Sequence, residues 1–255
     1  MEATQKKYRI AVLLDMSKSS AFVLTSAVEL AKQMDGTIEV VHVKPGRAIR
    51  QANPNFESTK AEIQEMITQM GEERQLPITY KLEYGHVKHR IRDYLALQKP
   101  DILVLGKRRP RMGLFFESIT DFVINQTRNT NVLILGEDDK FHTFKDINLG
   151  FFGTELEESD LEVIKDLQRD SEKPVRHFEI SEDTSQKRIF PWNKTVSYKF
   201  GKSTNAMDGL VNYVSRTHTQ LLCVPKKGSK RFWFKANPIK AVIRKIKVPL
   251  LILPK

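Results

Sequence analysis

Short apolar runs alternate with amphipathic stretches through the first half of the chain. Arg9 to Asp15 is a nearly continuous apolar run that ends in a carboxylate, which is typical of a strand buried on both faces. Ser17 to Met34 follows with apolar residues at helical spacing and stops at Asp35-Gly36. The alternation continues, so we expect strands at 37–43, 78–84, 101–106 and 132–135, and helices at 57–74, 87–98 and 115–127.

Strands separated by helices favour right-handed crossovers and a parallel sheet covered on both faces. The pattern therefore predicts an α/β fold with a doubly wound, five-stranded parallel sheet. If the strand order is 3-2-1-4-5, it reverses between the first and fourth strands, where such sheets bind ligands. That crevice would be lined by Asp15, Met16 and Ser17 after the first strand, and by the loop that begins at Gly106.

The second half of the chain repeats the first. Leu114-Phe115-Phe116 aligns without a gap with Phe232-Trp233-Phe234, and Val132 to Leu135 aligns with Leu250 to Leu253 at the same offset of 118 residues. Because both closing segments match at one offset, the sequence predicts two tandem domains, 1–137 and 145–255.

The second copy is the shorter one. Its first strand is expected from Ile147 to Phe152, and Gly201 corresponds to Gly85 of the first copy. The span from Ile147 to Gly201 is shorter than the span from Ile10 to Gly85. The missing length corresponds to one helix and its loop. We expect the charged segment Ser181 to Lys194, which contains Pro191, to replace that helix with irregular structure.

Several of these segments resemble the universal stress protein family. They are Val12 to Ser17, Pro100 to Gly106 ahead of a loop and helix, and the closing segments Thr130 to Leu135 and Val248 to Leu253. The resemblance covers nearly the whole chain as two copies. It implies a Rossmann-like fold of the adenine nucleotide alpha hydrolase type and a stress-response role. It also implies fifth strands that pair between the copies, so that one chain forms an intramolecular pseudo-dimer; a further homodimer of two chains stays open.

Family members that bind ATP carry G-x2-G-x9-G-[S/T] after the fourth strand, because glycines let backbone amides approach the phosphates. Asp15, Gly106 and Ser118 match that pattern, whereas Arg109 and Glu117 replace glycines. Glu117 would repel a triphosphate by roughly 1 kcal/mol. The nucleotide-binding residues that the resemblance implies are Asp15, Met16, Ser17, Val43, Gly106, Lys107, Arg109 and Ser118.

The second copy departs further from the pattern. Pro225 stands at the first glycine, and no aspartate ends the strand Asn148 to Gly153. We therefore expect a non-enzymatic stress-response or regulatory protein with degenerate nucleotide loops and no certain cofactor. The alternative is a sensor that binds ATP or another adenine nucleotide through the first domain. No combination of nucleophile, base and acid typical of an enzyme is evident.

The formal net charge of +11 is concentrated in two loops that occupy the same place in each copy, Lys107 to Arg111 and Lys226 to Lys235. These cations could bind a phosphorylated ligand or simply be solvated, and the second interpretation is favoured. The loops lack a base-reading motif, which argues against nucleic acid. The match of Phe232-Trp233-Phe234 to the first copy favours packing over membrane contact.

The remaining candidates are weak. His86 and His89 stand three apart with no third ligand nearby, so two surface histidines are favoured over a metal site. Cys223, the only cysteine, lies in an apolar run and is expected to be a buried core thiol. The apolar runs are too short to cross a bilayer and no signal peptide precedes the first strand, so we expect a cytoplasmic protein.

Overall fold

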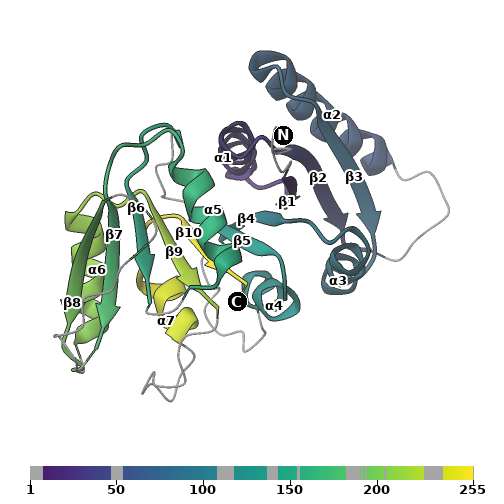
Figure 1. Ribbon diagram of the computed structural model, residues 1–255. Coiled ribbons are helices and arrows are strands. Elements are labelled where there is room, and N and C mark those ends of the chain that lie inside the picture. Colours follow the sequence, from purple (N-terminus) through teal and green to yellow (C-terminus); the bar gives the residue numbers. More distant parts are fainter. Residues whose placement is uncertain are drawn as a thin grey trace. The chain divides into compact units, whose positions relative to one another are not determined.

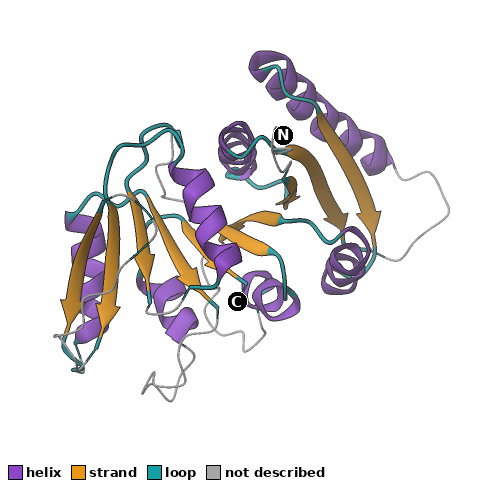
Figure 2. Cartoon of the chain, viewed as in Figure 1, coloured by secondary structure: helices purple, strands orange, loops and turns teal. Residues whose placement is uncertain are grey.

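The computed structural model describes residues 8–46, 54–107, 118–136, 143–153, 156–181, 190, 192, 194–203, 205–226 and 238–254, with the backbone alone at 54–58, 73 and 238–241. The chain divides into two compact units, Met1–Thr130 and Asn131–Lys255. Each unit contains a largely parallel sheet with helices packed beside it (Figures 1 and 2). The predicted α/β class with a mostly parallel sheet is therefore confirmed.

The first unit is entirely parallel in the strands that the structure describes, with the order β3-β2-β1-β4. Helices α1 and α2 contact each other, and α3 contacts α4, so each pair covers one part of the sheet. The strands are β1 (Arg9–Leu14), β2 (Thr37–Lys44), β3 (Ile78–Tyr84) and β4 (Ile102–Lys107), and the helices are α1 (Ser20–Gln33), α2 (Pro54–Arg74), α3 (Val87–Gln98) and α4 (Ile119–Gln126).

The second unit has the strand order β8-β7-β6-β9-β10-β5. All its neighbouring strands are parallel except β5 and β10, which are antiparallel, with Leu133 opposite Leu251. The expected pairing of the two closing strands is thus present. The strands are β5 (Asn131–Gly136), β6 (Leu149–Phe152), β7 (Val175–Ile180), β8 (Thr195–Phe200), β9 (Leu221–Pro225) and β10 (Leu250–Leu253), and the helices are α5 (Glu158–Gln168), α6 (Ala206–Arg216) and α7 (Pro238–Lys245).

Buried aliphatic side chains hold each sheet to its helices. Strands β4 and β9 are buried along almost their whole length. In α1 the buried face includes Leu24, Ala27, Val28 and Ala31, which recur at helical spacing. Each buried Val, Leu or Ile stabilises the fold by about 1.5–3 kcal/mol relative to an exposed one. Strands and helices therefore form where the apolar runs can be buried.

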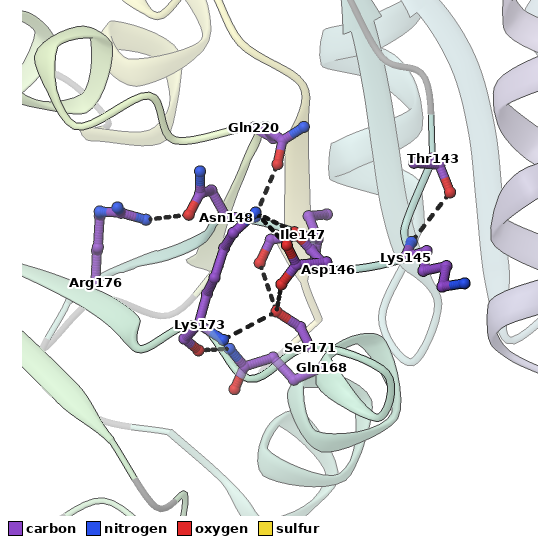
Figure 3. Close-up of polar contacts among 10 residues, drawn as sticks. All are labelled: Thr143, Lys145, Asp146, Ile147, Asn148, Gln168, Ser171, Lys173, Arg176 and Gln220. Atoms are coloured by element: carbon purple, nitrogen blue, oxygen red, sulfur yellow. Dashed lines mark hydrogen bonds and ion pairs between the residues drawn. The ribbon is translucent and has the colours of Figure 1, made fainter.

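Similar reciprocal hydrogen bonds join the amino ends of two neighbouring strands in each unit, β1 and β4 in the first and β6 and β9 in the second. In the first unit the Arg9 amide donates to the Asp101 carboxylate at 2.9 Å, and the Asp101 amide donates to the Arg9 carbonyl at 3.0 Å. In the second unit the Asn148 amide donates to Gln220 Oε1 at 2.9 Å, and the Gln220 amide donates to the Asn148 carbonyl at 2.8 Å (Figure 3).

Further polar contacts surround the start of β6. Figure 3 shows Arg176 donating to the Asn148 side chain at 2.8 Å, and Ser171 donating to the Ile147 carbonyl at 3.1 Å. Lys173 forms an ion pair with Asp146 at 2.7 Å. The first residues of the second unit's central strand are therefore held by side chains from the neighbouring loops.

The segment between β7 and β8 is only partly described. Residues 181, 190, 192 and 194 lie in no helix, and the predicted irregular replacement at 182–189 falls outside the described residues. Phe190 stacks on Trp192 with ring centroids 5.1 Å apart and meets the His177 ring edge-on at 4.7 Å. Aromatic rings therefore pack against β7 in this part of the second unit.

No helix in the part of the chain that the structure describes is both long and apolar enough to cross a membrane.

Candidate functional site at the carboxyl edge of the sheet

The carboxyl ends of β1, β2 and β4 lie next to one another in the first unit. Leu14 pairs with His42, and Leu13 pairs with Leu105. Asp15, Val43 and Gly106 each come one residue later on these three strands, so the structure brings three of the predicted site residues to one edge of the sheet. This is the position at which doubly wound sheets bind ligands.

Asp15 is exposed and is held by the turn that follows β1. Its Oδ1 accepts hydrogen bonds from the Ser17 amide at 2.9 Å and from Ser20 Oγ at 3.4 Å. Met16 between them has a φ of 56°, a left-handed conformation that is uncommon for a non-glycine residue. The turn therefore fixes the carboxylate beside the amino end of α1, where the helix dipole favours negative charge.

Gly106 lies against α1. A Cβ on Gly106 would stand 3.2 Å from Val23 Cγ2 and 3.8 Å from Ser19 Oγ. Ser19 Oγ is in turn 2.9 Å from Ser17 Oγ. The glycine thus allows β4 and α1 to pack closely, which gives it a structural role that needs no ligand, and it leaves two serine hydroxyls near the same edge.

The remaining predicted residues are spread over β4 and the start of α4. Lys107 is half-buried at the end of β4. Ser118 caps α4, because its Oγ accepts from the Asp121 amide at 3.0 Å, and it also contacts the Asp121 carboxylate at 2.9 Å. Arg109 and Glu117 lie outside the described residues. The hydrogen bonds of Ser118 are thus made to Asp121 of its own helix.

His42 is a residue of this edge that sequence reasoning missed. Its Nδ1 lies 2.8 Å from the Leu14 carbonyl oxygen, and because a carbonyl only accepts, Nδ1 carries the proton. The imidazole is buried and ties the end of β1 to β2. The available signal was a polar ring inside the apolar run 37–43, which predicts a partner within the core.

The carboxyl edge of the second unit is closed by apolar groups. A Cβ on Gly153, which has a φ of 129°, would stand 3.2 Å from the Pro225 ring. The Gly153 carbonyl accepts a hydrogen bond from His177 Nε2 at 2.7 Å, and the His177 ring stacks on Phe151 at 5.4 Å. The preceding residue is a buried phenylalanine, Phe152, and no carboxylate stands there.

The acidic group of the second unit lies on the following helix instead. Asp160 belongs to a capping box with Glu157 at the start of α5, and its side chain is 1% exposed. Burial raises the pKa of this carboxyl to about 6, with a smaller contribution from the Glu157 charge, while the hydrogen bond from the Glu157 amide lowers it. Sequence reasoning missed Asp160, although its spacing of three from Glu157 is the capping-box signal.

Cys223 lies on β9 near Asp160. The thiol is fully buried, as the sequence predicts. Burial raises the pKa of the Cys223 thiol well above its usual range, and the charge of Asp160 raises it further. The thiol is therefore protonated and unreactive while this part of the fold is closed.

The two histidines at the start of α3 stack on each other. The rings of His86 and His89 lie 4.3 Å apart at an angle of 40°. Within the described ranges, no group of three or more His, Cys, Asp or Glu side chains is placed to hold a metal ion.

The chain thus has an α/β fold with a mostly parallel sheet, and Asp15, Val43 and Gly106 lie at the carboxyl edge of the first unit's strands. The family model described as universal stress protein family matches residues 8–135, which is half of the chain, and the chain belongs to that family. No curated protein matches.

Solved structures match the chain over nearly its whole length. A universal stress protein from Archaeoglobus fulgidus DSM 4304 is 14% identical, with 97% of this chain and 96% of that chain covered and a TM-score of 0.70. A putative universal stress protein from Pseudomonas aeruginosa UCBPP-PA14 is 8% identical, with 98% and 94% covered and a TM-score of 0.67. At these identities the likeness concerns the fold.

Proposed function

We propose that this chain is a non-enzymatic, cytoplasmic regulatory protein of the universal stress type, with two tandem domains (1–137 and 145–255) and degenerate nucleotide loops. Each domain has the strand order 3-2-1-4-5, and the two form a pseudo-dimer within one chain. The observation that carries the proposal is the contrast between the two carboxyl edges. The edge of the first unit keeps an exposed Asp15, and that of the second unit is filled by Pro225, Phe151 and His177.

The register of β5 and β10 supports the tandem arrangement. Val132 pairs with Ile252, and Ile134 pairs with Leu250. In the sequence repeat Val132 corresponds to Leu250 and Ile134 to Ile252, so exchanging the two copies maps one pair onto the other. Such self-complementary pairing is the signature of a twofold-related interface. A homodimer of two whole chains would use a different surface, and size-exclusion chromatography tests for it.

The contacts of the site residues support degenerate loops. Gly106 is accounted for by its close approach to Val23, and Ser118 by its cap of α4. Asp15 accepts hydrogen bonds from Ser17 and Ser20 within its own turn. Each residue that matches the nucleotide pattern therefore has a structural partner, so none requires a ligand for its presence.

A second function is a nucleotide sensor that works through the first unit. The observation that favours it is the exposed Asp15 carboxylate beside Gly106, with the hydroxyls of Ser17 and Ser19 at the same edge. Carboxylate and hydroxyl groups suit the hydrogen-bond donors and acceptors of an adenosine moiety. ATP or another adenine nucleotide would then bind there, with Met16, Val43, Lys107, Arg109 and Ser118 around it.

Thermal unfolding with ATP, ADP, AMP and cyclic nucleotides at millimolar concentration separates the two functions. A ligand that binds only the folded state stabilises it by about 2.7 kcal/mol at a hundred times its Kd. The degenerate-loop proposal predicts no shift with any nucleotide and no consumption of ATP. A shift that Asp15→Ala abolishes, and that the exposed-carboxylate control Asp93→Ala retains, would establish the sensor and overturn the leading proposal.

A further inference from the structure

Asp160 is a buried acid, and among the described residues one of its two oxygens has no hydrogen-bond partner. Its Oδ2 accepts from the Glu157 amide at 3.2 Å, and its buried Oδ1 has no hydrogen-bond partner in the part of the chain that the structure describes. No ion pair joins Asp160 to a lysine or arginine within the described ranges. The proposed function does not use this group, and a buried carboxyl with an unsatisfied oxygen is uncommon in a native fold.

Two opposing effects act on the charge of Asp160. The amino end of a helix favours a carboxylate by about two- to fivefold, and the Glu157 amide adds a hydrogen bond. Burial without a cation disfavours the carboxylate by more, about a hundredfold, as the rise of the pKa from 3.8 to about 6 requires. Burial therefore wins, and the closed fold prefers the neutral acid.

The titratable groups that face Asp160 strengthen this preference. Within the described ranges, Glu157 on α5 itself and the Cys223 thiol on β9 interact with it. Glu157 is a second acid whose side chain accepts from the Asp160 amide in the capping box, and its charge repels a charge on Asp160. The thiol supplies no positive charge. Neither of these two groups compensates an ionised Asp160, whereas water that reaches the carboxylate would stabilise its charge.

We propose that the first turn of α5 is a pH-dependent switch that stays closed while Asp160 is a neutral acid. When Asp160 releases its proton to solvent, the turn opens, water solvates the carboxylate, and the Cys223 thiol becomes accessible. In the open turn Asp160 has the ordinary pKa of an exposed aspartate, so each rise in pH between about 4 and 6 favours opening. The closed form is therefore fully stabilised below about pH 4, and that stabilisation is lost as pH rises through about 6.

The thiol provides the measurement, because Cys223 is the only cysteine of the chain. The full-length protein is alkylated with iodoacetamide between pH 5 and 7.5, and each rate is divided by the rate for the urea-unfolded chain at the same pH. This ratio removes the intrinsic ionisation of the thiol. The protection of Cys223 is expected to fall about tenfold from pH 5 to 7.5, as the difference between an open-state pKa near 4 and a closed-state pKa near 6 requires.

Two variants test the assignment to Asp160. Asp160→Asn keeps the shape and the acceptor oxygen but cannot ionise, so its protection is expected to be high and constant over this pH range. Glu162→Gln, which removes an exposed charge from the same helix, is the matched control and is expected to keep the wild-type profile. Constant protection in the wild type, or an Asp160→Asn profile that still falls with pH, would overturn the proposal.

Amide hydrogen exchange of the wild type gives a second measurement that needs no variant. The amides of the first turn of α5 are expected to lose about tenfold of their protection over the same pH range, after correction for intrinsic exchange. The amides of β9 beneath are expected to stay protected. Equal loss of protection throughout the second unit would indicate global unfolding and would contradict a local switch.

Discussion

The two units hold the amino end of their first strand, β1 or β6, by similar hydrogen bonds. The carboxyl ends of these two strands have different surroundings. At the amino end, a side chain ahead of β4 or β9 accepts from a backbone amide, through Asp101 in one unit and Gln220 in the other. At the carboxyl end, the first unit presents the exposed Asp15, and the second unit covers Gly153 with a proline ring and a buried histidine. The hydrogen-bonded framework is therefore alike at the amino ends of these strands, and the difference between the units lies at the carboxyl ends, where a site would form.

The largest expected effect concerns the two buried histidines. His177→Ala removes a ring that is 1% exposed, stacks on Phe151 and bonds to the Gly153 carbonyl. We expect it to lower the free energy of unfolding by about 3–4 kcal/mol. His42→Ala removes one hydrogen bond to the Leu14 carbonyl and is expected to lower it by about 2 kcal/mol.

Urea unfolding followed by far-UV circular dichroism and by tryptophan fluorescence measures both histidine variants. Both tryptophans, Trp192 and Trp233, belong to the second unit, so fluorescence follows that unit alone. If the two variants lost equal free energy of unfolding, the carboxyl edge of the second unit would not depend on the packing of His177.

The next effect is the pH dependence of stability from Asp160. Because the pKa of Asp160 is raised to about 6 in the fold, its contribution is complete below the unfolded pKa of about 3.8 and is lost as pH rises through 6. The wild type is expected to lose about 1.5 kcal/mol more than Asp160→Asn between pH 5 and 8. Urea unfolding at the two pH values measures this difference. A variant that loses as much as the wild type would show that other groups govern the dependence.

The amino-end pairs should behave alike, in contrast to the histidines. Asp101→Ala and Gln220→Ala each leave a strand amide without its acceptor, so each is expected to cost about 1–2 kcal/mol. The ion pair of Arg9 with Asp101 adds little, because the Arg9 side chain is 61% exposed. Unfolding midpoints in urea would check this, and a difference above about 1 kcal/mol between the variants would break the symmetry of the two frameworks.

The smallest effects are expected at ion pairs between helices. Arg74→Ala removes a pair with the mostly buried Glu29 in the first unit and is expected to cost about 0.5–1 kcal/mol. Lys245→Ala removes a pair with Asp208 in the second unit, where the side chains are 47% and 57% exposed, and is expected to change stability by less than about 0.5 kcal/mol. Thermal unfolding at low and high salt would test both, since added salt should weaken the second pair more.

The bounds of helices and strands could be predicted from the sequence where a nearby residue such as glycine ends the element. The strand Ile78–Tyr84 and the helix Val87–Gln98 have the predicted bounds, because Gly85, with a φ of 128°, separates them. The helix predicted from Ser17 begins at Ser20 instead, because the Asp15 carboxylate captures the Ser17 amide and sets the turn first. The apolar pattern does not show this boundary, because a helix that starts at Ser17 and a turn closed by the Asp15 carboxylate are of similar stability.

The candidate site was less accessible to sequence reasoning. Asp15 and Gly106 could be placed, because each follows an apolar strand and parallel strands end at one edge. His177 could not, because its role depends on a carbonyl 24 residues away and on ring contacts made only in the fold. Asp160 was missed for a similar reason: capping-box spacing predicts an exposed acid, and its burial near the Cys223 thiol of β9 arises only in the fold.

The antiparallel pairing of β5 with β10 has a consequence for anyone who expresses the second half as a fragment. A fragment that starts at residue 145 would lack β5 and would leave Leu250–Leu253, an all-aliphatic strand, as a bare sheet edge. Such edges recruit strands from other molecules and lead to aggregation. A fragment that starts at residue 131 would keep β5 and with it the strand that covers β10.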